Sequence, residues 1–255
     1  MISAFEYINY LLNSKDRYDI HSPFVYDFVN SCLKIKIDKS FKKQRKTLSS
    51  SYLKNKNKII ITDAGVGSKK LGNERIVSHI YKLSSTKGKY ADLLFKLVNY
   101  YQPYRILEMG TSLGFGTYHL AGGNVNGKVL SIDACINTQN IAKSSLQKLQ
   151  FDNIDFFNDT FLHFFESYGG EKFDLVFVDG HHDGNALIAY MTTLEKHTHD
   201  NTLFVLDDIR WSKSMKEAWL ELIKMEKYHV SIDLFRMGIL IKRPQQAKEH
   251  FVINY

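Results

Sequence analysis

The sequence predicts an α/β fold with a doubly wound, mostly parallel sheet, a C-terminal antiparallel hairpin and an N-terminal helical extension. Two observations predict this fold. From residue 105 onward, short β-rich runs alternate with segments of helical periodicity, which is typical of parallel strands joined by helices. Near the end, the β-rich runs 230–235 and 239–242 are separated only by a short turn that contains Arg236 and Gly238, and they therefore predict a hairpin.

The N-terminal part is expected to be helical. Residues 3–13 repeat apolar side chains at helical spacing, and Ser22 before Pro23 predicts the start of a second helix. A later turn, 65–68, contains two glycines but lacks the spacing and the Gly-Lys-Ser/Thr ending of a phosphate loop. We interpret it as a loop that covers the main fold.

The main domain is expected to begin with a helix at 88–100, whose apolar residues have the pattern of a helix packed on a sheet. We therefore predict a boundary between an extension, residues 1–85, and a main domain, residues 86–255. The extension would be a lid or a substrate-binding lobe. The strands expected in the parallel sheet are 105–108, 128–132, 154–157, 174–178 and 203–206.

A glycine-rich turn follows the first of these strands. Glu108 closes the strand, and Gly110, Gly114 and Gly116 follow at the spacing GxxxGxG. Glycines at such a turn let the backbone approach a ligand closely and adopt positive φ, and the next helix points its N-terminal amide groups at the same ligand. In the dinucleotide fingerprint GxGxxG the paired glycines come first, so the order here differs. The turn predicts a cofactor loop, although many strand-to-helix turns carry glycine without a ligand.

Acidic residues follow the second and third strands. In nucleotide-binding α/β sheets a carboxylate at the position of Asp133 accepts hydrogen bonds from both ribose hydroxyl groups. The alternative is that Asp133 caps the next helix, predicted at 138–149, but it lies early in the sequence for that role. Asp159 follows the third strand, where Asx residues are also ordinary turn formers.

Carboxylates also follow the fourth and fifth strands. Asp179 comes directly after 174–178, and Asp207 and Asp208 come directly after 203–206. Because ligands bind outside the carboxyl ends of parallel strands, we expect both groups to face the glycine-rich turn. Three convergent carboxylates with a nearby imidazole could hold a hard divalent cation such as Mg²⁺. Such a cation would bind two substrate oxygens and lower the pKa of a hydroxyl group.

These features resemble a known family. The segment ExGxxxGxG is similar to motif I of the class I S-adenosylmethionine (SAM)-dependent methyltransferases. FVDGHHDG and LDDIRWS are similar to segments of the cation-dependent O-methyltransferases of the catechol and caffeoyl-CoA type, and this resemblance covers roughly residues 87–242. HSPFVYDF, VGSKK and DDIRWSKSMKEAW together resemble an uncharacterised group of bacterial SAM-dependent methyltransferases. The resemblance implies a Rossmann-like fold with SAM as the cofactor.

The resemblance also implies roles for single residues. Trp211 would form a wall of the acceptor pocket. Asp179, Asp207 and Asp208 would be the ligands of Mg²⁺ or Mn²⁺. His182 would be the general base, and Asp179 would also belong to the catalytic group. Asp159 would contact the adenine amino group, and the full set that would bind SAM is Glu108, Gly110, Ser112, Gly114, Gly116, Asp133, Asp159 and Asp179.

Two positions differ from the family pattern. The family's Asn ligand is Asp208 here, and its catalytic Lys is His182. An imidazole can act as a general base near neutral pH, so this chemistry is retained in principle. Structural alternatives remain open, because Asp207 and Asp208 could cap the next helix, with Ser212 as another cap, and His181 and His182 could be ordinary loop residues.

The composition indicates a protein of a reducing compartment. No apolar run approaches the roughly 18–20 residues needed to span a bilayer, and the N-terminus lacks a signal-peptide pattern. The two cysteines, Cys32 and Cys135, have no CxxC spacing. We therefore expect a cytoplasmic protein without membrane contact, and we leave open whether it forms a homodimer.

The formal net charge of +7 is concentrated in one segment. Residues 34–58 contain ten Lys or Arg residues and one acid, Asp38. Such a block can bind phosphate-rich partners or be a solvated surface segment. Few aromatic residues and the run Ser49, Ser50, Ser51 favour a mobile, solvated loop over a nucleic-acid-binding surface.

Taken together, the sequence predicts a SAM-dependent methyltransferase that methylates an oxygen atom of a small molecule, with assistance from a divalent cation. One alternative is an RNA or protein methyltransferase that docks through residues 34–58. Another is a SAM-binding protein without transferase activity. A nicotinamide-dependent dehydrogenase is disfavoured by the order of the glycines and by the closing hairpin.

Overall fold

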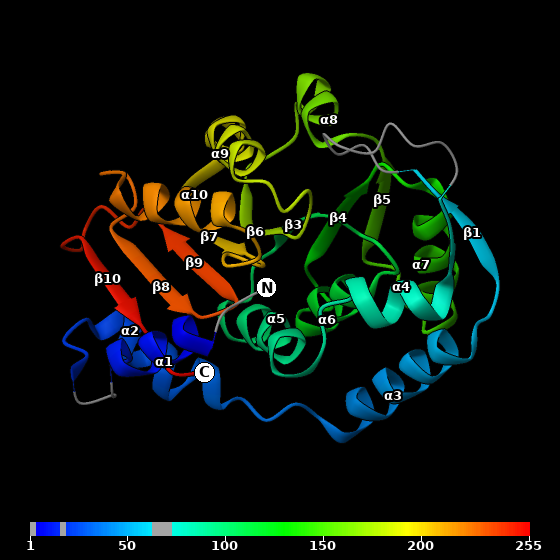
Figure 1. The fold of residues 1–255 in the computed structure, drawn as a ribbon, viewed down its shortest axis with the longest axis horizontal. Coiled ribbons are helices and arrows are strands. Elements are labelled where there is room, and N and C mark those ends of the chain that lie inside the picture. The colour runs from blue at the N-terminus through cyan, green and yellow to red at the C-terminus, as the bar shows by residue number, and fades with distance from the viewer. Residues whose placement is uncertain (1–3, 16–18, 63–72) are drawn as a thin grey trace. The chain divides into compact units, whose positions relative to one another are not determined.

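The computed structural model describes residues 4–15, 19–62 and 73–255 (Figure 1). The chain forms two compact units. We call residues 31–164 the glycine-loop unit, and residues 1–30 together with 165–255 the acidic-cluster unit.

The predicted division of the chain after residue 85, into an extension and a main domain, stays a prediction. Of the described residues, 31–62 and 73–85 pack with the helices and strands that follow them, inside the glycine-loop unit, whereas the first helices belong to the acidic-cluster unit. The turn predicted at 65–68 lies outside the described residues. Within the described part of the chain, no helix combines the length and the apolar character needed to cross a membrane.

Three parallel strands form the centre of the glycine-loop unit, in the order β3 (Arg105–Met109), β4 (Lys128–Asp133) and β5 (Ile154–Asn158). The side chains of β3 from Ile106 to Met109 are fully buried, as expected for a strand of a covered parallel sheet. The strands agree with the predicted ranges to within one residue. The helices of this part of the unit are α5 (Gly88–Tyr101), α6 (Phe115–Gly123) and α7 (Ile136–Lys148).

The basic segment is a helix rather than the predicted mobile loop (Figure 1). Asp38 caps the N-terminus of α3 (Lys39–Lys54) by accepting hydrogen bonds from backbone amide groups of the first turn. Phe41, Leu48 and Tyr52 recur on one face of α3 and are buried. The prediction was wrong because these three residues form a narrow apolar stripe, and the many Lys and Ser residues between them hide its helical period.

Two tyrosine hydroxyl groups connect α3 to the segment after β3. Tyr52 donates a hydrogen bond to the carbonyl of Leu113 at 2.5 Å, and Tyr118 donates to the carbonyl of Phe41 at 2.7 Å. The stripe on α3 therefore supports the glycine-rich turn and the helix that follows it. The remaining elements of this region are η2 (Cys32–Lys34), the antiparallel pair β1 (Lys58–Ile61) and β2 (Asn73–Ile76), and α4 (Val77–Ser84).

The acidic-cluster unit contains five strands in the order β6-β7-β9-β8-β10. β6 (Phe173–Val178) and β7 (Thr198–Leu206) are parallel, and β7 is antiparallel to β9 (Met237–Ile241). β9 pairs with β8 (Val230–Leu234) as an antiparallel hairpin, which confirms the prediction. β10 (Glu249–Val252) lies parallel to β8 and was not predicted, because its four residues are too short for a clear alternation.

The first two helices of the acidic-cluster unit begin where the sequence predicts them. α1 and α2 start within one residue of the predicted positions, and Pro23 is the first residue of α2. α8 crosses the boundary between the two units. The bounds are α1 (Ala4–Asn13), α2 (Pro23–Asn30), α8 (Phe161–Ser167), α9 (Gly184–Thr193), η3 (Leu194–His197) and α10 (Lys213–Lys224).

Candidate functional site

The glycine-rich turn leads from β3 into α6 in a tightly held conformation. Gly110 and Gly114 have φ angles of 112° and 73°, a region that favours glycine. The amide group of Gly110 donates to the carbonyl of Ile132 at 2.9 Å. The amide group of Ser112 donates to the Asp133 carboxylate at 2.7 Å. The turn is thus attached to the end of β4 at two points.

Glu108 lies beneath the turn rather than on its surface. One carboxyl oxygen accepts hydrogen bonds from the hydroxyl groups of Thr117 and Ser131, the latter at 2.6 Å, and the other oxygen has no partner within the described residues. Burial raises the pKa of Glu108 to about 8; the two hydroxyl groups oppose this shift, and the charge of Asp133 adds to it. Glu108 is therefore mostly protonated at neutral pH and supports the turn from inside. Its direct contact with a cofactor stays a prediction.

The other predicted cofactor residues meet at one edge of the glycine-loop unit, except Asp179, which belongs to the acidic-cluster unit. The two carboxylate oxygens of Asp133 accept from the amide groups of Ser112 and Cys135, both at 2.7 Å. The amide group of Asp159 donates to the Asp133 carbonyl at 3.2 Å, and its carboxylate lies 2.7 Å from the imidazole of His163. The residues that this edge brings together are Gly110, Ser112, Gly114, Gly116, Asp133 and Asp159.

In the acidic-cluster unit, β6 and β7 end side by side. Their register pairs Val178 with Leu206, so Asp179 and Asp207 each follow the last residue pair. The amide group of Asp207 also donates to the carbonyl of Val178 at 2.9 Å. The two strands are therefore neighbours, as the spacing of the sequence predicts.

Arg236, in the turn between β8 and β9, binds both acids that follow β7. Its Nε and Nη2 atoms donate to the two oxygens of Asp207 at 2.9 and 2.7 Å, and Nε lies 3.0 Å from Oδ1 of Asp208. The Asp207 side chain has 0% of its surface exposed and that of Asp208 has 15%. Asp207, Asp208 and Arg236 form a compact, largely buried ion-pair cluster, which we call the acidic cluster.

The charged groups of this cluster shift one another's pKa values. Burial raises the pKa of Asp208 and the carboxylate of Asp207 adds to the rise, whereas Arg236 and His182 oppose it. Burial alone would lower the pKa of Arg236, but the two carboxylates more than offset this effect, and the net shift is upward. The guanidinium group therefore stays charged at neutral pH.

The backbone around the cluster is in an uncommon conformation. His181, His182, Asp208 and Phe235 have φ values between 30° and 72°, a region that costs non-glycine residues of order 1–3 kcal/mol each. The Nε2 atom of His182 lies 3.8 Å from Oδ2 of Asp208, and its ring centroid lies 5.7 Å from that of Trp211. The strained loops thus hold an imidazole between a carboxylate and an exposed indole.

The acidic cluster does not have the arrangement of a metal site. Across the ranges that the structure describes, no group of three or more His, Cys, Asp or Glu side chains is placed to hold a metal ion. The oxygens of Asp207 and Asp208 contact Arg236 instead. Mg²⁺ or Mn²⁺ would need these oxygens as ligands, so the predicted set of Asp179, Asp207 and Asp208 does not fit such a cation in this arrangement.

The helix-cap alternative for Asp207 and Asp208 is also excluded. Ser212 caps α10, because its hydroxyl oxygen accepts a hydrogen bond from the amide group of Met215 at 3.2 Å. In the same unit Asp183 caps α9. Asp207 and Asp208 are therefore engaged by the arginine and not by a helix terminus.

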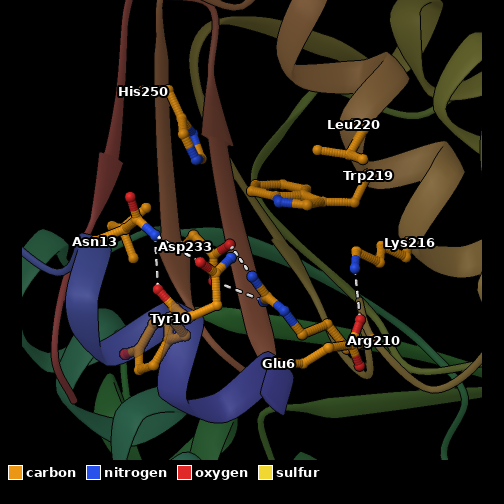
Figure 2. A pocket seen from close by; sticks show the side chains of 11 residues that line it. Glu6, Tyr10, Asn13, Arg210, Lys216, Trp219, Leu220, Asp233 and His250 are labelled. Carbon is orange, nitrogen blue, oxygen red and sulfur yellow. Dashed lines mark hydrogen bonds and ion pairs between the residues drawn. The ribbon is translucent and has the colours of Figure 1, made fainter. Parts of the chain in front are cut away.

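Sequence reasoning missed the two arginines that join the segment after β7 to the hairpin. Arg210 donates to both oxygens of Asp233 at 2.8 and 2.6 Å, in the same two-point manner as Arg236 on Asp207. Figure 2 shows the Arg210–Asp233 pair beside a cavity of about 330 Å³, lined by side chains of this unit. An ion pair between residues more than 20 positions apart leaves no local signal, so the sequence identifies Arg236 only as a turn residue.

Part of the chain is similar in sequence to known methyltransferases. Residues 107–209 match a family described as "Methyltransferase domain". The catechol O-methyltransferase of Mycobacterium tuberculosis is 28% identical over 129 residues, which are 50% of this chain and 56% of that protein. The chain thus aligns with little more than half the length of this relative.

Solved structures share the fold at low sequence identity. The S-adenosylhomocysteine (SAH)-bound methyltransferase PaMTH1 of Podospora anserina has a TM-score of 0.60 and 12% identity, over 88% of this chain and 96% of that chain. The O-methyltransferase of Bacillus cereus, in complex with SAH, has a TM-score of 0.57 and 17% identity, over 86% and 97%. TomG of Streptomyces achromogenes, in complex with SAM, has a TM-score of 0.57 and 16% identity, over 86% and 96%.

The sequence match and the structural matches point to the same architecture. The matched residues run from β3, across the glycine-rich turn, to the acids that follow β7. Residues 107–209 are therefore similar to a methyltransferase domain, and the chain shares the fold of the three solved methyltransferases.

Proposed function

We propose that this chain binds SAM through the glycine-loop unit and transfers its methyl group to an oxygen atom of a small molecule. The observation that supports this best is the turn between β3 and α6, which two hydrogen bonds attach to the end of β4 at Ile132 and Asp133. The O-methyltransferases named above support the reaction class.

The residues at this edge fit SAM by their chemistry. Each oxygen of Asp133 accepts one backbone hydrogen bond, and a carboxylate oxygen has a further lone pair with which to accept from a ribose hydroxyl group. The turn with Gly110 and Gly114 lets the backbone approach the methionine half of the cofactor, and the N-terminus of α6 favours its carboxylate. Asp159 would accept from the adenine amino group. When bound, SAM supplies an electrophilic methyl group.

In the acidic-cluster unit, we assign acceptor activation to His182. Its imidazole would take the proton of the acceptor hydroxyl group, and the nearby carboxylate of Asp208 would stabilise the imidazolium that forms. Trp211, of which 60% is exposed, offers an apolar surface for the acceptor. Methyl transfer depends mainly on the orientation of the acceptor and on the deprotonation of its hydroxyl group, and these residues have the chemical groups for both tasks. Because the acidic cluster does not fit Mg²⁺ or Mn²⁺, no step here is assigned to a metal ion.

Two other functions of the chain are less well supported. An RNA or protein methyltransferase would dock through the basic segment, and the exposed face of α3 with Lys42, Lys43 and Lys46 is the surface that it would use. The opposite face of α3 is buried, so part of the segment has a structural role. A SAM-binding protein without transferase activity would keep the cofactor residues and lack turnover.

One experiment separates these functions. The protein is incubated with SAM carrying a labelled methyl group and with fractionated cell extract, and label is followed into small molecules, RNA and protein. We expect label in small molecules only. Label in RNA or protein would favour the macromolecular function, and SAM binding by calorimetry without any labelled product would favour the non-catalytic one.

A further inference from the structure

The cation in the acidic cluster is a side chain of the protein, the guanidinium group of Arg236. Asp207 has no exposed side-chain surface, and both of its oxygens accept hydrogen bonds from the Arg236 guanidinium group. The same guanidinium group lies 3.0 Å from Asp208. The oxygens that a divalent cation would require are therefore the oxygens that Arg236 contacts.

Arg236 is held in this position by its backbone and its neighbours. The amide group of Ile209 donates to the Arg236 carbonyl at 3.0 Å, which joins the two segments directly beside the ion pair. Phe235, immediately before it, has a φ of 72° and packs its ring against Tyr7 and Tyr10, with centroid distances of 4.9 and 5.0 Å. Arg236 is therefore a fixed part of the cluster and differs from an exposed arginine that moves freely in solvent.

A divalent cation and this guanidinium group exclude each other. Mg²⁺ binds oxygen ligands at about 2.0–2.1 Å and keeps several water molecules, so it needs room at the carboxylates. Asp207 has no solvent-exposed surface at which a hydrated ion could bind. Two cations on the same pair of carboxylates would also repel each other strongly in a site with little water.

We propose that Arg236 takes the position of the divalent cation in this acidic cluster, so that the chain binds its acceptor without a chelated metal ion. The consequence for the acceptor rests on the proposed function. A chelated cation binds two neighbouring oxygen atoms, whereas a guanidinium group that pairs with Asp207 and Asp208 makes no such demand. The acceptors of this chain therefore do not need two neighbouring oxygen atoms.

The test is a titration of the purified full chain with Mn²⁺ alone, followed by electron paramagnetic resonance of the free ion. We expect no binding by the wild-type chain tighter than about 10⁻³ M. In Arg236→Gln, which removes the charge and frees the carboxylates, we expect Mn²⁺ affinity to rise at least about tenfold, and adding Asp207→Asn to this variant should remove the gain. Arg210→Gln is the matched control, since it removes the other two-point arginine pair and should leave Mn²⁺ binding at the wild-type level.

Two results would overturn the proposal. The first is that the wild-type chain binds Mn²⁺ with a dissociation constant of about 10⁻⁴ M or lower and that Asp207→Asn abolishes this binding. This result does not depend on the arginine variant. The second is an Arg236→Gln protein with wild-type circular dichroism that gains no Mn²⁺ affinity. Neither readout depends on turnover, so a failure here is distinct from a failure to find methyl transfer. Where labelled product is found, EDTA should not change the rate at which this product forms.

Discussion

The guanidinium group of Arg236 and the carboxylate of Asp207 form a two-point ion pair between the β8–β9 turn and the end of β7. The two contacts measure 2.9 and 2.7 Å, and the Asp207 side chain has no exposed surface. A buried carboxylate is tolerated only where its charge and its hydrogen-bonding capacity are both satisfied. The pair therefore makes the position of the acidic cluster depend on the C-terminal hairpin.

Breaking this pair from one side should destabilise the protein. Arg236→Gln leaves Asp207 as a buried charge without its partner, and we expect the free energy of unfolding to fall by about 3 kcal/mol, measured by urea denaturation. The control is Lys213→Gln, which removes an exposed contact with Glu217 and should cost less than about 0.5 kcal/mol. Equal effects of the two substitutions would contradict the assignment of a buried, mutually dependent pair.

Local features of the sequence predict much of the fold and of the proposed cofactor edge. The strands β3 to β7 and the hairpin β8–β9 follow from runs of β-rich residues, and acids at strand ends such as Asp133 and Asp179 can be recognised by position alone. Arg236 cannot, because its partner lies 29 residues earlier and no periodic pattern links them.

The dependence on residues far apart in the sequence also explains why the helix α3 was not predicted. Whether the Lys-rich segment of α3 forms a helix depends on partners such as Leu113 and Tyr118, which lie far along the chain. The surroundings of Glu108 could not be predicted either, because only the folded unit brings the hydroxyl groups of Thr117 and Ser131 to its carboxyl group.

Gly110→Val should abolish SAM binding. The φ of Gly110 is 112°, a region that a β-branched residue does not adopt, so valine would distort the turn. Calorimetry with SAM is the measurement, and NAD should bind neither protein. The control is Gly169→Val, at an exposed position with no heavy atom within 4 Å of the added Cβ atom, and it should bind SAM normally. Normal SAM binding by Gly110→Val would show that the turn is not the cofactor loop.

The stability of the protein should fall as pH rises, through Glu108. The pKa of Glu108 is raised from 4.5 to about 8 in the folded chain, chiefly by burial. Between these values the unfolded chain releases the proton and the folded chain keeps it, so the stabilising contribution is complete below pH 4.5 and is lost as pH approaches 8. The slope attributable to this group is at most about 1.4 kcal/mol per pH unit.

Glu108→Gln isolates this effect, because glutamine is close in shape and does not titrate. We expect the difference in unfolding free energy between wild type and variant to move in favour of the variant as pH rises from 5 to 8. Urea denaturation at each pH gives this difference, and it removes the contributions of all other groups that titrate equally in both proteins. A difference that stays constant across this range would mean that Glu108 is ionised in the folded chain.

The two faces of α3 should respond differently to substitution. Lys42, Lys43 and Lys46 are exposed, and changing all three to Gln should alter the free energy of unfolding by no more than about 0.5 kcal/mol and leave methylation of a small acceptor unchanged. Tyr52→Phe, on the buried face, removes the hydrogen bond to the Leu113 carbonyl, should cost about 1 kcal/mol and should weaken SAM binding by loosening the turn.

Binding of a fluorescent RNA oligonucleotide at several salt concentrations completes this test. If the exposed face of α3 is solvated surface, the wild-type chain should show little RNA affinity at physiological salt, and the triple substitution should change nothing. If the face docks RNA, each lost phosphate contact should reduce the slope of log affinity against log salt by about one. Tight, salt-sensitive RNA binding that the three substitutions weaken would make RNA the better candidate for the methyl acceptor, and α3 would then bind substrate through its lysines while it supports the cofactor turn through Tyr52.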